Sequence, residues 1–163
     1  MNFINNIMLF HYRNKYFFPK IEKILLIFKD ELKKYFLNHI NILCNNKRLL
    51  LFLIKNEIIQ MDSQIANKCD KNFFSQEIKL FNKSDTEEIQ IDPNFEEYRL
   101  KGENEQIICQ IIRDDNIHEF IIYVNKNELS LNTKIEQSQY ETNEFLIGKN
   151  PTLIEYSAFF GSV

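Results

Sequence analysis

The sequence predicts an all-α fold, and three observations lead to that prediction. Apolar residues recur at steps of three, four and seven along much of the chain, which is the spacing of one face of a helix. Glycine is scarce, with three among 163 residues, whereas average usage is roughly 7%. Because tight β-hairpins and phosphate-binding loops need glycine for positive φ angles, this scarcity argues against turn-rich β folds and nucleotide-binding folds. Hydrophobic residues make up 44% of the chain and charged residues 26%, which is typical of a globular protein.

The first expected helix covers residues 20–36, within an N-terminal helical region of residues 1–84. Pro19 suits its first turn, because the fixed φ angle of proline matches the helix. Its apolar residues form one stripe, which we expect to pack into a core. The members of the stripe are Ile21, Ile24, Leu25, Phe28, Leu32, Tyr35 and Phe36. Lysines occupy the other face, so the alternative is a membrane-surface role for a basic amphipathic helix, although three acidic residues dilute its charge.

A helical hairpin is expected next, formed by short helices over residues 40–44 and 47–55, with two asparagines breaking the pattern between them. Isolated helices below about 12–15 residues are marginal in water. The two helices must therefore lie against neighbours, as the units of a repeat protein do. A further helix is expected over residues 63–68, with Asp62 or Ser63 as its N-cap.

Residues 85–97 form an acidic segment with six carboxylate side chains and no basic one, interrupted by Pro93. We interpret it as a solvated loop, within an acidic linker or insertion that covers residues 85–101. It has little apolar surface to bury against the entropic cost of ordering, so we expect it to be the most mobile internal segment. The alternative is a docking site for a basic partner.

Helical patterns return after the acidic segment. Isoleucines at helical spacing predict a helix over residues 103–113, and a second apolar pattern predicts one over residues 117–124. The residues between them read Asp-Asp-Asn, a combination with turn and N-cap chemistry. A long polar connection over residues 125–150 then leads to a final helix that begins near Thr152.

The three cysteines are predicted to be chemically ordinary. Cys44, Cys69 and Cys109 are an odd number at wide spacings, so we expect reduced thiols rather than a disulfide framework or a metal motif. Cys109 and His118 could meet across the turn between the last two helices of this region, as a nucleophile and its base. Because Cys109 lies among isoleucines on a helix, a buried and inert thiol is the preferred interpretation.

No catalytic, cofactor-binding or metal site is predicted elsewhere. Asp114, Asp115 and Glu119 suggest a cation, but a calcium loop needs a glycine that is missing here, and helix capping explains both aspartates. The net charge of −3 lacks the basic footprint of a nucleic-acid partner. No apolar run approaches the roughly 20 residues that span a bilayer, and no secretory signal is convincing. We therefore expect a cytoplasmic protein without a membrane partner.

Residues 152–161 read TLIEYSAFFG, which resembles the start of an ankyrin unit, T-P-L-H-x-A followed by A-x-x-G. The identical or conservatively replaced positions are Thr152, Ile154, Ser157, Ala158 and Gly161. Leu153 and Glu155 depart from the proline and histidine of the motif. The threonine can cap the helix, the small residues allow close helix approach, and the glycine allows a tight turn.

The sequence as a whole resembles one large family, the ankyrin-repeat proteins of parasitic protists that carry a repeat-associated domain of unknown function. The similarity is carried by residues 17–25, 46–53, 111–115 and 151–162. The resemblance implies stacked helix–turn–helix hairpins in an ankyrin-like α-solenoid with degenerate repeats. One degenerate hairpin would lie within the N-terminal region, and further repeats within residues 102–163.

The resemblance also implies that the last repeat is incomplete, which would leave Tyr156, Phe159 and Phe160 exposed. It brings no catalytic residue, cofactor or small-molecule substrate. The expected function is a non-catalytic protein–protein interaction scaffold whose protein partner the sequence does not name. The alternatives are a membrane-surface module that acts through residues 20–36, and an enzyme with an unrecognised site.

Overall fold

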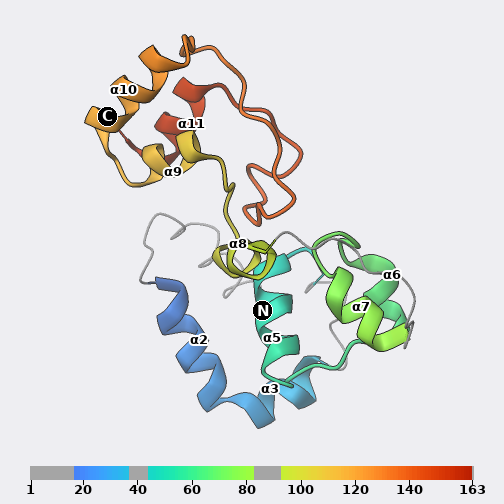
Figure 1. Cartoon of the computed structure of the whole chain (residues 1–163). Helices are drawn as coiled ribbons and strands as arrows, with labels where there is room; N and C mark the ends of the chain where they lie inside the picture. The colour runs from blue at the N-terminus through green and yellow to red at the C-terminus, as the bar shows by residue number, and fades with distance from the viewer. Residues whose placement is uncertain (1–16, 37–43, 83–92, 163) are drawn as a thin grey trace. The chain divides into compact units, whose positions relative to one another are not determined.

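The computed structural model describes residues 17–36, 44–82 and 93–162, and the chain divides into two compact units (Figure 1). Unit 1 is Met1–Leu100 and unit 2 is Lys101–Val163. Each unit has its own cluster of buried apolar side chains. The two units are described separately.

All regular elements of the described residues are helices, which confirms the all-α prediction for this part of the chain. In the same ranges, extended residues pair only at an isolated bridge between Lys134 and Thr152. Helices that lie mainly in unit 1 are α2 (Phe17–Ile27), α3 (Lys29–Phe36), α5 (Lys47–Lys55), α6 (Ser63–Lys68), α7 (Ser75–Asn82) and α8 (Phe95–Lys101). Those of unit 2 are α9 (Ile107–Arg113), α10 (Ile117–Lys126) and α11 (Leu153–Phe160). The stacking of hairpins into a solenoid stays a prediction.

The helix expected over residues 20–36 is two helices, α2 and α3, which meet at Phe28 (Figure 1). The apolar stripe does not enter the core as a whole, so that part of the prediction is wrong. Leu25 is buried, and Ile21 and Leu32 pack partly against the core. Ile24 and Phe28 are about half exposed. Within α2 the core takes the side of the helix that carries Phe18 and Leu25, which leaves Ile24 facing outward.

The core of unit 1 is built around α5, whose bounds match the prediction. Four of its leucines are almost fully buried, namely Leu49, Leu50, Leu51 and Leu53. They pack with Ile65 of α6 and with Phe73 and Phe74. The two phenyl rings contact each other edge to face, with their centroids 5.0 Å apart. Asp62 caps α6, as expected, by accepting a hydrogen bond from the Ile65 amide at 2.8 Å. The helix expected over residues 40–44 lies mostly outside the described residues, and Cys44 itself is in a turn.

Two helices of unit 1 were not expected, α7 and α8. Helix α8 occupies the end of the predicted acidic linker, so the prediction of a solvated loop is wrong for residues 95–97, while residues 85–92 lie outside the described ranges. Phe95 is buried, and the Arg99 side chain has no solvent exposure. Arg99 donates to both carboxylate oxygens of Glu77, at 2.6 and 2.9 Å, and to the Phe73 carbonyl at 3.0 Å. The ion pair between Arg99 and Glu77 joins α8 to α7 at the core of unit 1. Its partners are 22 residues apart, so the pattern of residues along the chain does not reveal it.

Unit 2 packs α9 against both α10 and α11. Helix α9 begins at Ile107, four residues later than expected, because the Asn104 side chain accepts a hydrogen bond from the Gln106 amide and holds a turn there. The connection after α10 is non-helical, as predicted, but it also contributes Ile135 and Leu146 to the core. Tyr156 is 1% exposed, so the expectation that it is exposed is wrong.

Candidate functional site

Helices α5 and α10 begin and end in the same way, although they belong to different units. An asparagine caps each start: Asn46 accepts from the Leu49 amide, and Asn116 accepts from the Glu119 amide. A second asparagine ends each helix. Its side-chain amide donates to the carbonyl four residues earlier at 2.8 Å, from Asn56 in α5 and from Asn127 in α10.

The residue after each of these C-terminal asparagines has a left-handed backbone. The φ angle is 55° at Glu57 and 51° at Glu128. The amide of each glutamate bonds the carbonyl three residues back, and the next amide bonds the carbonyl five residues back. This pair of bonds is the Schellman motif, which usually places glycine at the left-handed position. Glutamate is costly there, so its use at two equivalent positions indicates a shared construction.

Helices α9 and α11 also end in the Schellman motif. Asp115 has a φ angle of 52° after α9, and Gly161 has 69° after α11. Their amides bond Ile112 and Ala158, three residues back, and the next amide in each case bonds five residues back. All four of these helices therefore end in the Schellman motif, and α5 and α10 are matched further by the asparagines at both of their ends. The sequence contains a signal for the match between α5 and α10, because Lys-Asn-Glu occurs at both 55–57 and 126–128. Apolar periodicity does not reveal this repeated tripeptide.

The ankyrin-like motif residues lie along α11. Thr152 is the N-cap, and it forms a reciprocal capping box with Glu155, in the position where the motif has histidine. Hydrogen bonds from the Thr152 backbone and hydroxyl lower the pKa of Glu155. Gly161 is the left-handed residue after the helix, as expected for a tight turn. Ala158 is exposed, while Ile154 and Ser157 line a common hollow.

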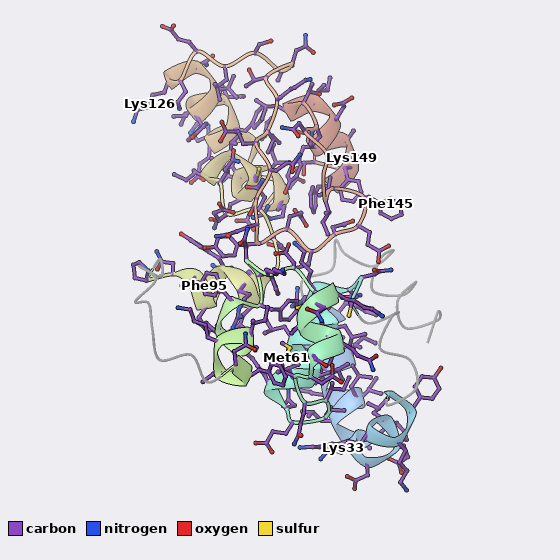
Figure 2. All side chains as sticks on the ribbon, turned by 90° about the vertical axis from the view of Figure 1, so that its right-hand side faces the viewer. Lys33, Met61, Phe95, Lys126, Phe145 and Lys149 are labelled. Carbon is purple, nitrogen blue, oxygen red and sulfur yellow. The ribbon has the colours of Figure 1, made fainter. Side chains whose placement is uncertain are left out.

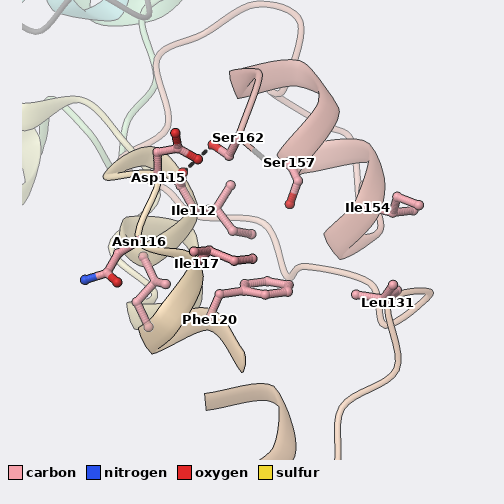
Figure 3. A pocket seen from close by; sticks show the side chains of 10 residues that line it. Ile112, Asp115, Asn116, Ile117, Phe120, Leu131, Ile154, Ser157 and Ser162 are labelled. Carbon is pink, nitrogen blue, oxygen red and sulfur yellow. Dashed lines mark hydrogen bonds between the residues drawn. The ribbon is translucent and has the colours of Figure 1, made fainter. Parts of the chain in front are cut away.

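That hollow, of about 180 Å³, is formed by the three helices of unit 2 and the connection between α10 and α11 (Figure 3). The lining side chains belong to Ile111, Ile112, Asp115, Asn116, Ile117, Phe120, Leu131, Ile154, Ser157 and Ser162. Most are apolar, and the hydroxyl of Ser162 is engaged because it donates to the Ile112 carbonyl. Apolar cavities of roughly 150 Å³ admit a benzene-sized group. The hollow is therefore suited to an apolar side chain.

Three apolar residues that line the hollow are also exposed, and so is Ile121 of α10. Ile117, Ile121, Leu131 and Ile154 are each about half exposed, and we call these four residues the isoleucine face. Ile117 and Ile121 are four residues apart on α10, so their side chains lie on the same side of the helix. Exposed apolar residues that gather around a hollow are typical of a docking surface rather than of scattered surface residues.

Nucleophilic chemistry is not supported at Cys109. The thiol is fully buried, and burial raises its pKa to about 12. The neighbouring Tyr156 hydroxyl is also buried and accepts a hydrogen bond from Arg113 at 2.8 Å. His118, the proposed base, is exposed on α10. A thiol with this pKa stays protonated at neutral pH, so it is a poor nucleophile. Burial also raises the pKa of Cys69, to about 11.

Metal and catalytic chemistry find no further support in the described ranges. No group of three or more His, Cys, Asp and Glu side chains within them could hold a metal ion. The described residues that line the hollow include no histidine, cysteine or lysine. Among the helices of the described residues, none is long and apolar enough to cross a bilayer. The chain matches no family model, no curated protein and no solved structure.

Proposed function

We propose that this chain is a non-catalytic scaffold of the ankyrin type, in which degenerate helical hairpins present a surface to a protein partner. The observation that carries the proposal is the matched construction of α5 and α10, which have an asparagine at each end and a left-handed glutamate after the second one. We take α5 and α10 as the second helices of two units, and α9 and α11, which pack against each other, as the first helices of two successive units. A chain built of repeated hairpins buries a continuous core by stacking neighbours, and its function lies in the surface that the stack presents.

The isoleucine face is the proposed contact surface. Its residues come from the second helix of one unit, the first helix of the next and the connection between them. An apolar side chain of the partner would enter the hollow, since a docking site of this kind gains most from an anchor in a desolvated pocket. The acidic residues at the start of α10 and before it, Asp114, Asp115 and Glu119, favour a partner with basic residues beside its apolar anchor. We place this interaction in the cytoplasm.

The test is an affinity purification of the tagged chain from the cells that express it, followed by quantitative mass spectrometry. The double variant Ile121→Lys/Ile154→Lys adds charge to the isoleucine face. A matched control, Leu80→Lys/Leu100→Lys, makes the same change at two exposed leucines of α7 and α8. Because all four side chains are half exposed or more, circular dichroism and thermal unfolding of both variants should remain close to those of the unchanged chain.

The proposal expects a reproducible set of co-purifying proteins that is lost in the face variant and retained in the control. Binding of a purified member of that set should weaken at least tenfold in the face variant. Retention of the whole set by the face variant would show that this surface is not used. A catalytic role would instead appear as turnover of a small molecule that depends on residues lining the hollow.

A further inference from the structure

The corner where α2 meets α3 carries an apolar patch that the core of unit 1 does not cover. Leu26, Ile27 and Phe28 follow one another at the corner, and Ile27 is 75% exposed. Ile24, Ile27 and Phe28 have the spacing of one helical face, which points away from the buried side chains of Phe18 and Leu25. We call Ile24, Leu26, Ile27 and Phe28 the corner patch. Exposed apolar side chains that gather at one place are typical of an interaction surface.

Lysines flank the corner patch along the chain on both sides, although Asp30 and Glu31 follow it at the start of α3. Lys20 lies one turn before Ile24, and Lys23 lies one turn before Ile27, so both side chains lie on the same face as the isoleucines. Lys33 and Lys34 of α3 are exposed as well, and Figure 2 shows Lys33 at the outer edge of unit 1. Residues 17–36 hold five lysines against three carboxylates, which gives a net charge of +2 in a chain whose net charge is −3.

The corner patch and the isoleucine face of unit 2 differ in the charge of the residues near them. The residues 107–126, which hold α9 and α10, carry one arginine and one lysine against three carboxylates. The two surfaces expose similar apolar side chains but are bordered by opposite charge. A surface that combines exposed apolar side chains with lysines fits the headgroup region of an anionic bilayer, where the alkyl stems of lysine lie along apolar surface and the ammonium groups reach the phosphates.

We propose that the corner of α2 and α3 docks unit 1 on an anionic phospholipid surface. The corner patch enters the interface, and Lys20, Lys23, Lys33 and Lys34 contact the acidic headgroups. The contact is peripheral, since α2 and α3 are far shorter than a membrane-spanning helix. The proposal is independent of the protein-binding role of the isoleucine face, because it uses other residues in the other unit.

Cosedimentation of the full chain with large unilamellar vesicles tests this directly. The vesicles are pure phosphatidylcholine or phosphatidylcholine with 30 mol% phosphatidylserine. We expect binding to the anionic vesicles to exceed binding to the neutral vesicles at least tenfold, and to fall steeply with added salt. The variant Ile27→Glu/Phe28→Glu should reduce binding to the anionic vesicles at least tenfold, and Lys20→Glu/Lys23→Glu should do the same.

A matched control separates the corner patch from a general charge effect. Leu80→Glu/Leu100→Glu adds the same two charges to unit 1 at exposed leucines outside the corner, and its binding should stay within threefold of the unchanged chain. All substituted side chains are exposed, so helix content should be unchanged in each variant. Absence of binding to anionic vesicles would overturn the proposal, as would equal binding to both vesicle types. Concentration-dependent dimerisation of the free chain that the corner variant abolishes would also overturn it, because it would show a second copy on the patch.

Discussion

Helices α5 and α10 share their caps and differ in burial. Both start at an asparagine N-cap and end with an asparagine and a left-handed glutamate. Yet α5 buries four leucines in the core of unit 1, whereas α10 has no fully buried residue and leaves Ile117, Ile121 and Ile122 about half exposed. The difference teaches that the end signals define where a helix forms, while the neighbours decide what it buries. In unit 1 the neighbours include α8 with its buried arginine, and in unit 2 one side of α10 stays open.

The largest effect is expected at Arg99, which joins α8 to α7 in unit 1. Arg99→Ala leaves the Glu77 carboxylate, itself only 11% exposed, without its cation. Removing one partner of a buried ion pair costs about 3–5 kcal/mol. Hydrogen exchange should therefore speed up in α5, whereas α10 should exchange as in the unchanged chain, because the contacts of Arg99 all lie in unit 1. Equal loss of protection in α10 would show that the two units unfold together.

Truncation of an apolar side chain should also cost much more unfolding free energy in α5 than in α10. Leu50→Ala in α5 removes a fully buried side chain and should lower the free energy of unfolding by about 2–5 kcal/mol. Ile121→Ala in α10 removes a half-exposed side chain and should change it by at most about 0.5 kcal/mol. Urea denaturation of both variants, followed by circular dichroism, measures the two values. Similar losses would mean that α10 is covered in solution, for example by a second copy of the chain.

The matched N-caps offer a finer comparison. Asn46→Ala and Asn116→Ala each remove the side-chain oxygen that accepts a hydrogen bond from an amide at the start of a helix, and loss of such a cap costs about 0.5–2 kcal/mol. Asn46 is buried, whereas Asn116 is only half-buried. We therefore expect the larger cost for α5, because water replaces the missing acceptor less readily there. Thermal unfolding of both variants measures the two losses, with Asn→Asp at each position as the conservative substitution. A larger loss for Asn116→Ala than for Asn46→Ala would contradict the expectation.

The smallest expected effect is a difference in acid sensitivity. Burial alone would raise the pKa of Asp70, but hydrogen bonds from Lys47 and from the Phe73 and Asn72 amides lower it overall. The Lys47 ammonium lies 2.6 Å from the carboxylate, in unit 1 at the start of α5. A group whose pKa is lower in the folded state stabilises above its unfolded pKa, and this contribution is lost as the pH falls through the folded pKa.

Asp70→Asn should therefore flatten the decline of unfolding free energy between about pH 5 and pH 2. The measurement is urea denaturation at a series of pH values, with α5 followed by hydrogen exchange at the same pH. The control is Asp114→Asn, which changes an exposed carboxylate of unit 2. A pH profile that Asp70→Asn leaves unchanged, or that Asp114→Asn flattens equally, would contradict the assignment.

Local signals in the sequence determined the position of several helices in this protein. Apolar spacing placed α5, and N-cap residues placed α6 and the start of α11, because the hydrogen bonds that begin a helix are made within four residues of sequence. Capping by Thr152 and the left-handed turn at Gly161 were predicted on the same ground. The all-α class followed from helical periodicity and scarce glycine, and both are properties of short segments.

Tertiary structure alone decided which apolar surfaces are buried and which stay exposed. Arg99 is buried because Glu77, Gln76 and Glu96 surround it, and Tyr156 is buried because the Arg113 guanidinium satisfies its hydroxyl. The corner patch is exposed because the core of unit 1 takes the other side of α2, which carries Phe18 and Leu25. In each case the deciding contacts include residues distant in sequence. Periodicity identifies an apolar face, but the free energy of burial depends on what that face meets in space.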